Sequence, residues 1–211
     1  MGIIIPGAAL EDASYPIEPG EKLLLQKFKT SLPDSCLLWH NADLPGGCRP
    51  SITAYIPRLG IFVIEVKEWF NGAITKIDET SWEVSIDGGP KDVPAPYEQA
   101  KYCAEEIKKL LEARADLLAA DGARKGSFKL PINYFVAFSN INRADLTEEA
   151  SNYMPPDKYL FIEDITAVGE SLKGAELAKY FLRISARNFW PTLPLTPEEL
   201  VALRGALSRA A

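Results

Sequence analysis

The stretch Gly60-Ile61-Phe62-Val63-Ile64-Glu65-Val66-Lys67 decides the fold of this chain. Its apolar run predicts a strand of a sheet that is buried on both faces. Side chains alternate along a strand. The stretch therefore has two faces, one with Ile61, Val63, Glu65 and Lys67 and the other with Phe62, Ile64 and Val66. Two charged side chains thus follow an apolar run on a single face.

The charged pair at the end of this strand has two interpretations. Glu65 can hold a hard divalent cation, while Lys67 positions an attacking water or stabilises a phosphate in the transition state. The alternative is a surface ion pair where the strand emerges into water, because short motifs match freely. Burying such a pair costs several kcal/mol unless the two groups serve each other or a ligand. The neighbouring segments must decide.

The bulk properties describe an ordinary globular chain. Its 211 residues, 47% of them hydrophobic, are enough for one domain with a full core. We expect neither a membrane helix nor a signal peptide, because no apolar run is long enough and the start has no basic leader. The net charge of −6 argues against a free-standing, tight nucleic-acid binder. Phosphate contacts must come from a local patch, a metal ion or a partner chain.

The three cysteines, Cys36, Cys48 and Cys103, are odd in number and lack metal-like spacing. This pattern predicts a reduced, cytoplasmic protein. The single histidine, His40, has no partner that the sequence reveals, and we interpret it as structural.

Strands are expected at residues 36–40, 51–56, 73–77, 81–86, 130–138 and 159–162, beside the central one. A loop of Arg58-Leu59-Gly60, with Gly60 left-handed, predicts the hairpin register. This register pairs Pro57 with Ile61, Thr53 with Glu65, and Ser51 with Lys67, all on one face. A turn is expected at residues 68–72.

Helices are expected at residues 19–31, 94–120, 176–189 and 197–209. Glu21 lies in the first turn of the first helix, where a carboxylate also complements the helix dipole. Gln99 lies near the edge of the buried stripe of the second helix, where a polar border residue is the simpler interpretation. Helices and strands in this order predict an α/β or α+β sandwich.

With these positions placed, the sequence resembles the nuclease-related domain (NERD) family of the restriction-endonuclease-like superfamily. The matching residues are Gly20-Glu21, Arg49-Pro50, Gly60 to Trp69, Gly72, Trp82, and Pro94 with Glu98-Gln99-Ala100. The whole is most similar to the N-terminal domain of some bacterial DNA helicases. The resemblance implies an α/β fold with a mixed sheet flanked by helices. It divides the chain into an irregular arm (1–17), a nuclease-related core (18–140), and a mostly helical C-terminal extension packed on the core (141–211).

The resemblance also implies a site. Glu65, Lys67, Gln99 and Glu21 would be active-site residues, with Mg²⁺ held by Glu65, Glu21 and position 51. The family has an aspartate at that position, whereas this chain has Ser51. Two functions follow. One is Mg²⁺-dependent hydrolysis of DNA, with a helicase domain in cis or in trans. The other is a catalytically degenerate module that binds nucleic acid or a partner.

Overall fold

The computed structural model of the chain describes residues 1–86, 88–154, 157–185 and 189–208. Its main sheet has six strands in the order β1-β2-β3-β4-β8-β9. They are β1 (Ile3–Ile5), β2 (Leu37–His40), β3 (Ile52–Ile56), β4 (Gly60–Phe70), β8 (Ile132–Asn140) and β9 (Tyr159–Leu160). β4 is the centre of this mixed sheet, because it pairs antiparallel with β3 and parallel with β8.

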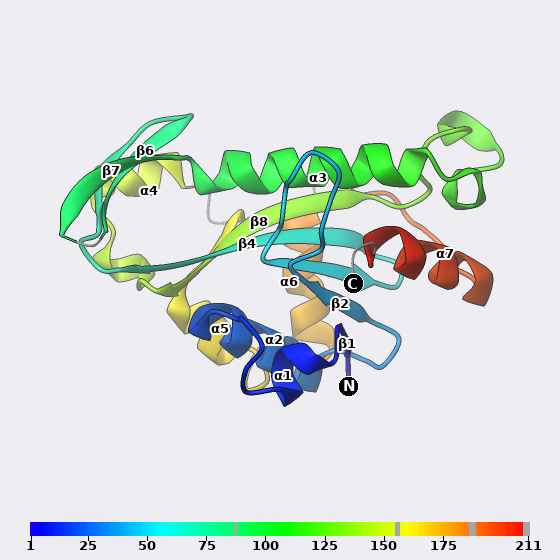
Figure 1. Cartoon of the computed structure of the whole chain (residues 1–211), viewed down its shortest axis with the longest axis horizontal. Helices are drawn as coiled ribbons and strands as arrows, with labels where there is room; N and C mark the ends of the chain where they lie inside the picture. Colours follow the sequence, from blue (N-terminus) through cyan, green and yellow to red (C-terminus); the bar gives the residue numbers. More distant parts are fainter. Residues whose placement is uncertain (87, 155–156, 186–188, 209–211) are drawn as a thin grey trace.

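Helices cover both faces of the main sheet (Figure 1). One face packs against α2 (Pro19–Ser31), α5 (Ile162–Ala167) and α6 (Ala175–Ser185), and the other against α3 (Pro96–Glu112) and α7 (Pro197–Leu207). The predicted alternation of β4 is confirmed, since Phe62, Ile64 and Val66 join the first core and Ile61 and Val63 join the second. The predicted α/β fold with a mixed sheet and flanking helices is thereby confirmed.

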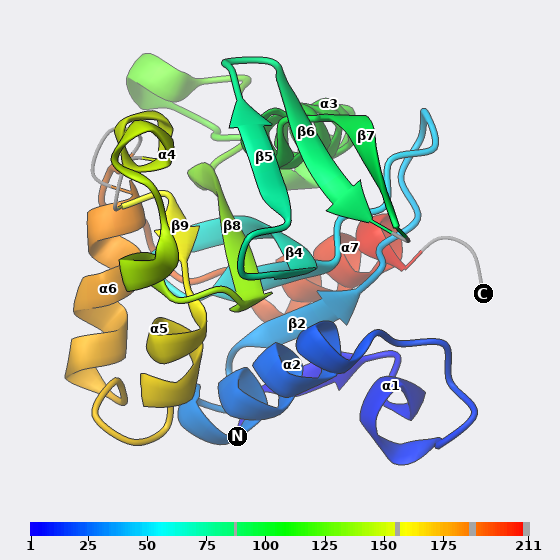
Figure 2. The same ribbon diagram turned by 90° about the vertical axis from the view of Figure 1, so that its left-hand side faces the viewer.

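A second, three-stranded antiparallel sheet lies beside the start of α3 (Figure 2). It consists of β5 (Ile74–Ile77), β6 (Ser81–Ile86) and β7 (Gly89–Pro94). Its Trp82 and Val84 pack against Phe138 and Tyr159 of the main sheet, next to α4 (Glu148–Tyr153). β7 was not predicted from the sequence. With two prolines, Pro90 and Pro94, among its paired residues, β7 has the composition of an edge strand rather than of a buried one.

Several boundaries differ from the sequence predictions. The irregular arm expected over residues 1–17 contains β1, which pairs parallel with β2 as an edge strand, and the short helix α1 (Ala8–Glu11). β4 continues to Phe70 through the turn expected at residues 68–72. The predicted helix at 94–120 ends at Glu112, and a 3-10 turn then carries Leu117 into the same core. The helix α5 was not predicted. The predicted ends of α6 and α7 reach into residues 186–188 and 209, outside the described residues.

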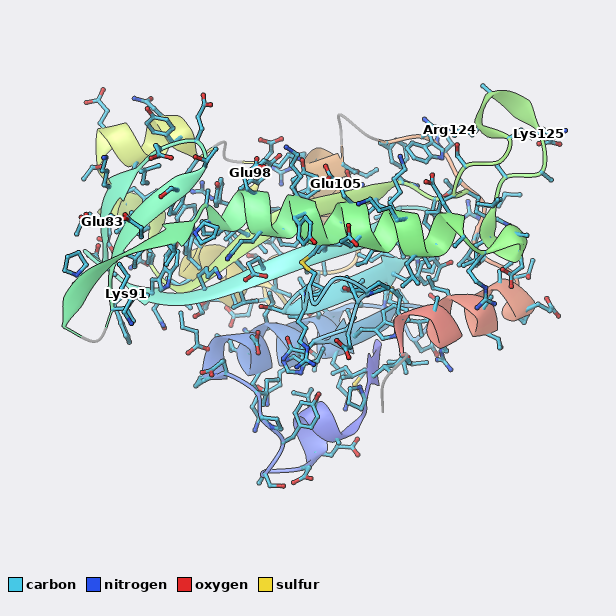
Figure 3. The ribbon with its side chains drawn as sticks, turned by 45° about the horizontal axis from the view of Figure 1, so that its top comes forward. Glu83, Lys91, Glu98, Glu105, Arg124 and Lys125 are labelled. Carbon is cyan, nitrogen blue, oxygen red and sulfur yellow. A yellow bond between two sulfur atoms is a disulfide. The ribbon has the colours of Figure 1, made fainter. Side chains whose placement is uncertain are left out.

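The expectation of three reduced cysteines is wrong for two of them, because Cys48 and Cys103 form a disulfide while Cys36 is free and buried (Figure 3). Fifty-five residues separate the pair, so only the folded chain brings them together. The bond ties the loop of residues 41–50 to α3. Among the described residues, no helix is both long and apolar enough to cross a membrane.

Candidate active site at the end of the central strands

Glu65 and Lys67 stand on the face of β4 that α3 covers, because they continue the alternation of Ile61 and Val63. Lys67 Nζ lies 2.8 Å from Glu65 Oε1, and the two side chains are only 18% and 15% exposed. The same Nζ lies 5.7 Å from the centre of the Trp69 ring. The pair is therefore not an exposed surface ion pair. A pair held this far from water calls for a structural or chemical reason.

The β3–β4 hairpin places Ser51 beside Glu65, in a register that corrects the predicted one. Ile56 pairs with Gly60 and Thr53 with Val63, so the register is shifted by two residues from the expected pairing. The loop begins at Pro57, which leaves Arg58 and Gly60 with positive φ values of 69° and 106°. The shift keeps the same faces, because side chains repeat every two residues.

Gly60 has a second reason to be glycine besides its left-handed backbone. A Cβ at this position would lie 2.2 Å from the carbonyl oxygen of Pro131, the residue just before β8. That carbonyl accepts a hydrogen bond from the Ile61 amide at 2.9 Å. The close approach of two backbones thus fixes where β8 joins the central strand.

Glu21 approaches from the other side of the sheet, on the first turn of α2. It is buried and lies 2.8 Å from Nε2 of His40, whose Nδ1 lies 3.2 Å from the Tyr15 hydroxyl. It also accepts the Glu18 amide in a capping box. Burial raises the pKa of Glu21, but hydrogen bonds from His40 and Ser51 outweigh it, so the pKa is lowered overall and the group stays ionised.

Ser51 joins the two parts of the site. Its Oγ accepts a hydrogen bond from the Val66 amide at 3.1 Å, and its hydroxyl lowers the pKa of the nearby Glu21 carboxyl. Because Val66 lies between Glu65 and Lys67, the serine connects the carboxylate of α2 to the strand that carries the ion pair.

The N-terminus of α2 is held against the ends of β4 and β8. The Gly20 amide donates to the Glu68 carboxylate, and the Glu68 carbonyl accepts from Asn140 Nδ2 at 3.0 Å. A Cβ on Gly20 would lie 2.4 Å from Ser139 Oγ. Gly20 and Glu68 therefore place Glu21. This role of Glu68 was missed from the sequence, because the residue was assigned to a turn.

Gln99 lies in the N-terminal half of α3, one turn before Cys103. Glu98 and Glu105 mark the outer side of this helix (Figure 3), whereas Ala100 and Cys103 are buried. The Gln99 Oε1 atom is buried and has no hydrogen-bond partner among the described residues. A buried oxygen without a partner calls for an explanation such as a water or an ion.

The structure brings the predicted residues together only in part. Glu65 meets Lys67, and Glu21 meets Ser51, but within the described part of the chain no hydrogen bond joins Gln99 to either pair. The roles of His40 and Tyr15 were also missed, because nothing in the sequence places them beside Glu21. Their only signal was that a lone histidine at the end of a buried strand needs partners.

The donor atoms suit a Mg²⁺ ion that is only partly held by protein. No group of three His, Cys, Asp or Glu side chains that could hold a metal exists among the described residues. Glu65, Glu21 and the buried Gln99 Oε1 are oxygen donors of the kind that Mg²⁺ binds, and no contact among the described residues joins the three. Mg²⁺ commonly takes one or two carboxylates and completes its shell with waters and substrate phosphates.

Comparison with known proteins gives one match. A family model described as a nuclease-related domain matches residues 18–139, more than half of the chain. Searches of curated proteins and of solved structures found no match.

Proposed function

The chain belongs to the nuclease-related domain family, and from that premise we propose that it hydrolyses phosphodiester bonds of DNA with Mg²⁺. The observation that carries the proposal is the Glu65–Lys67 pair, 2.8 Å apart and largely buried at the end of β4. A carboxylate and an ammonium group held there supply a cation ligand and a fixed positive charge, which are the two needs of phosphoryl-group hydrolysis.

Each residue has a separate task in this proposal. Glu65 and Glu21 would hold the cation, and the buried Gln99 amide oxygen would accept a hydrogen bond from a water beside it. A bound Mg²⁺ ion would neutralise phosphate charge and activate water. The ammonium group of Lys67, 2.8 Å from Glu65, would position the attacking water or stabilise the developing charge on the phosphate.

The test is cleavage of single- and double-stranded DNA with Mg²⁺ or Mn²⁺, comparing the chain as given with Ser51→Asp and Glu65→Ala. We expect cleavage by the chain as given and its loss in Glu65→Ala. Ser51→Asp adds a third carboxylate next to Glu21 and Val66, and we expect it to tighten cation binding and raise the rate. Cleavage that survives Glu65→Ala would contradict the proposal.

A second function is favoured by Ser51 itself. Its hydroxyl is engaged with the Val66 amide and with Glu21, and a neutral hydroxyl is a weak Mg²⁺ ligand. A chain with this residue would bind nucleic acid or a partner protein without cutting. Cleavage by Ser51→Asp alone, with equal DNA affinity in both proteins, would select this second function.

We further propose that the domain acts with a DNA helicase, in cis or in trans. The acidic chain, with a net charge of −6, needs another source of DNA affinity, and a helicase supplies it. Co-purification of this chain with a helicase from its own cells, lost when the surface of residues 141–211 is changed, tests the association. Tight DNA binding by the isolated chain at physiological salt would contradict the need for a helicase as the source of DNA affinity.

A further inference from the structure

His40 is a buried histidine with both ring nitrogens engaged. Its side chain is fully shielded from solvent, and its ring meets that of Tyr15 edge to face at 5.4 Å. Nε2 lies 2.8 Å from Glu21 Oε2, and Nδ1 lies 3.2 Å from the Tyr15 hydroxyl. A buried histidine needs partners for its ring nitrogens, and here one of the two partners is the buried carboxylate of Glu21.

The direction of the hydrogen bond to Glu21 follows from the chemistry of the groups. An ionised carboxylate only accepts, so His40 Nε2–H donates to Glu21, and Nδ1 makes the second hydrogen bond of the ring, with the Tyr15 hydroxyl. Burial and then the charge of Glu21 raise the pKa of Tyr15, which keeps it a hydroxyl. Ser51 accepts from the Val66 amide, and its hydroxyl lowers the pKa of Glu21.

Glu21 is thus the common acceptor of two donors, His40 Nε2–H and the Glu18 amide, and the Ser51 hydroxyl lowers its pKa further. A free glutamate side chain turns about several bonds and loses that freedom when it binds a cation. Here the freedom is already lost in the folded chain. Among the described residues, no lysine or arginine lies within ion-pair distance of Glu21, so the imidazole of His40, rather than a lysine or arginine, holds its carboxylate.

We propose that His40 is a positioning residue, which with Tyr15 behind it fixes the Glu21 carboxylate beside Ser51 for binding the divalent cation. This inference rests on the proposed function, since it concerns the cation of that same site. The arrangement is that of a group behind a metal ligand, where a hydrogen bond sets the ligand's orientation. Loss of such a group typically weakens metal affinity about 10- to 100-fold.

The test measures Mn²⁺ affinity by calorimetry without DNA, and Mn²⁺-dependent cleavage separately. His40→Phe keeps a ring but removes the donor, and we expect Mn²⁺ to bind about 10- to 100-fold more weakly. His40→Gln keeps a donor amide and is expected to stay within about threefold of the parent protein. Tyr15→Phe, which loosens the ring without removing its donor to Glu21, should fall between them.

A matched control lies in the same part of the fold. A cavity of about 280 Å³ is lined by Tyr15, His40 and Ser208, among others. The Ser208 Oγ accepts from Trp39 Nε1 at 3.2 Å and has no part in holding Glu21. Ser208→Ala should therefore leave Mn²⁺ affinity unchanged. A lower affinity in Ser208→Ala would indicate a general loosening of this region.

The outcomes separate the inference from the function on which it rests. Thermal unfolding first shows whether His40→Phe is folded. If the folded variant binds Mn²⁺ and cleaves DNA as well as the parent protein does, the positioning role is wrong and the proposed nuclease function stands. If His40→Phe does not fold, Tyr15→Phe decides in the same way. If neither the parent nor Ser51→Asp binds Mn²⁺, the proposed hydrolysis fails, and the positioning role is overturned with it.

Discussion

The Glu65–Lys67 pair and the group of Glu21, His40 and Tyr15 meet at one end of the sheet but are built differently. The first comes from two residues of a single strand, and its geometry follows from the alternation of side chains along β4. The second comes from three segments, with Glu21 on α2, His40 at the end of β2 and Tyr15 between α1 and α2. The difference teaches that one carboxylate of the site is fixed by local structure and the other by packing.

The Glu65–Lys67 pair on β4 can be disrupted without changing the group of Glu21, His40 and Tyr15. Lys67→Met removes the charge next to Glu65, and we expect cleavage to fall about 100- to 1000-fold, the usual cost of losing one group that stabilises the transition state. Measured kcat should fall more than DNA affinity. Lys101→Met is the matched control, because its pair with Glu98 at 3.2 Å is exposed and off the site. A similar loss in both variants would argue for a general charge effect.

The Cys48–Cys103 disulfide anchors the loop of residues 41–50 to α3. This loop begins directly after His40 and ends directly before Ser51, so the bond restrains the segment between these two residues. Reduction, or Cys48→Ser with Cys103→Ser, should lower the free energy of unfolding by about 2–4 kcal/mol. Denaturant unfolding with and without reductant measures this. The double variant should no longer respond to reductant, and a parent protein that does not respond either would show that the bond is not formed in solution.

The group of Glu21, His40 and Tyr15, which packing holds together, depends on how closely α2 approaches the sheet. Gly20→Ala would bring a Cβ within 2.4 Å of Ser139 Oγ, and we expect a loss of about 1–3 kcal/mol in unfolding free energy. Gly205→Ala is the control, because a Cβ added to Gly205 in α7 would meet no neighbouring segment within 4 Å. That change should instead stabilise by about 0.5–1 kcal/mol. Equal effects at the two glycines, measured by denaturant unfolding, would contradict the close approach of α2.

The smallest effect is the pH dependence that Glu21 contributes. Its pKa in the folded chain lies below its ordinary value of 4.5, so its ionised form is favoured by folding. The resulting stability is fully present above about pH 4.5 and is lost as pH falls through the lower, folded pKa. With divalent cations chelated, the stability difference between the parent and Glu21→Gln should shrink below pH 4.5. A stability difference that grows as pH falls would show that folding raises the pKa of Glu21, contrary to this prediction.

Much of the architecture could be predicted because it rests on periodicity and caps. The faces of β4, the bounds of α2 and the capping box at Thr196 that begins α7 all follow from residues close together in the chain. The hairpin register was missed by two residues, because the three-residue loop lies one position earlier than predicted, and Gly60 instead begins β4 at the close backbone approach of Pro131. β7 was missed because an edge strand needs little apolar content.

By itself, the sequence determined the central strand, the side of it on which Glu65 and Lys67 stand, and the family to which residues 18–139 belong. Alternation and local caps act over a few residues, so they can be recognised without the fold. Only the tertiary structure decided that His40 and Ser51 hold Glu21 and that Cys48 meets Cys103. These contacts join segments that are distant along the chain, and only packing of α2 and α3 on opposite faces of one sheet brings them into reach.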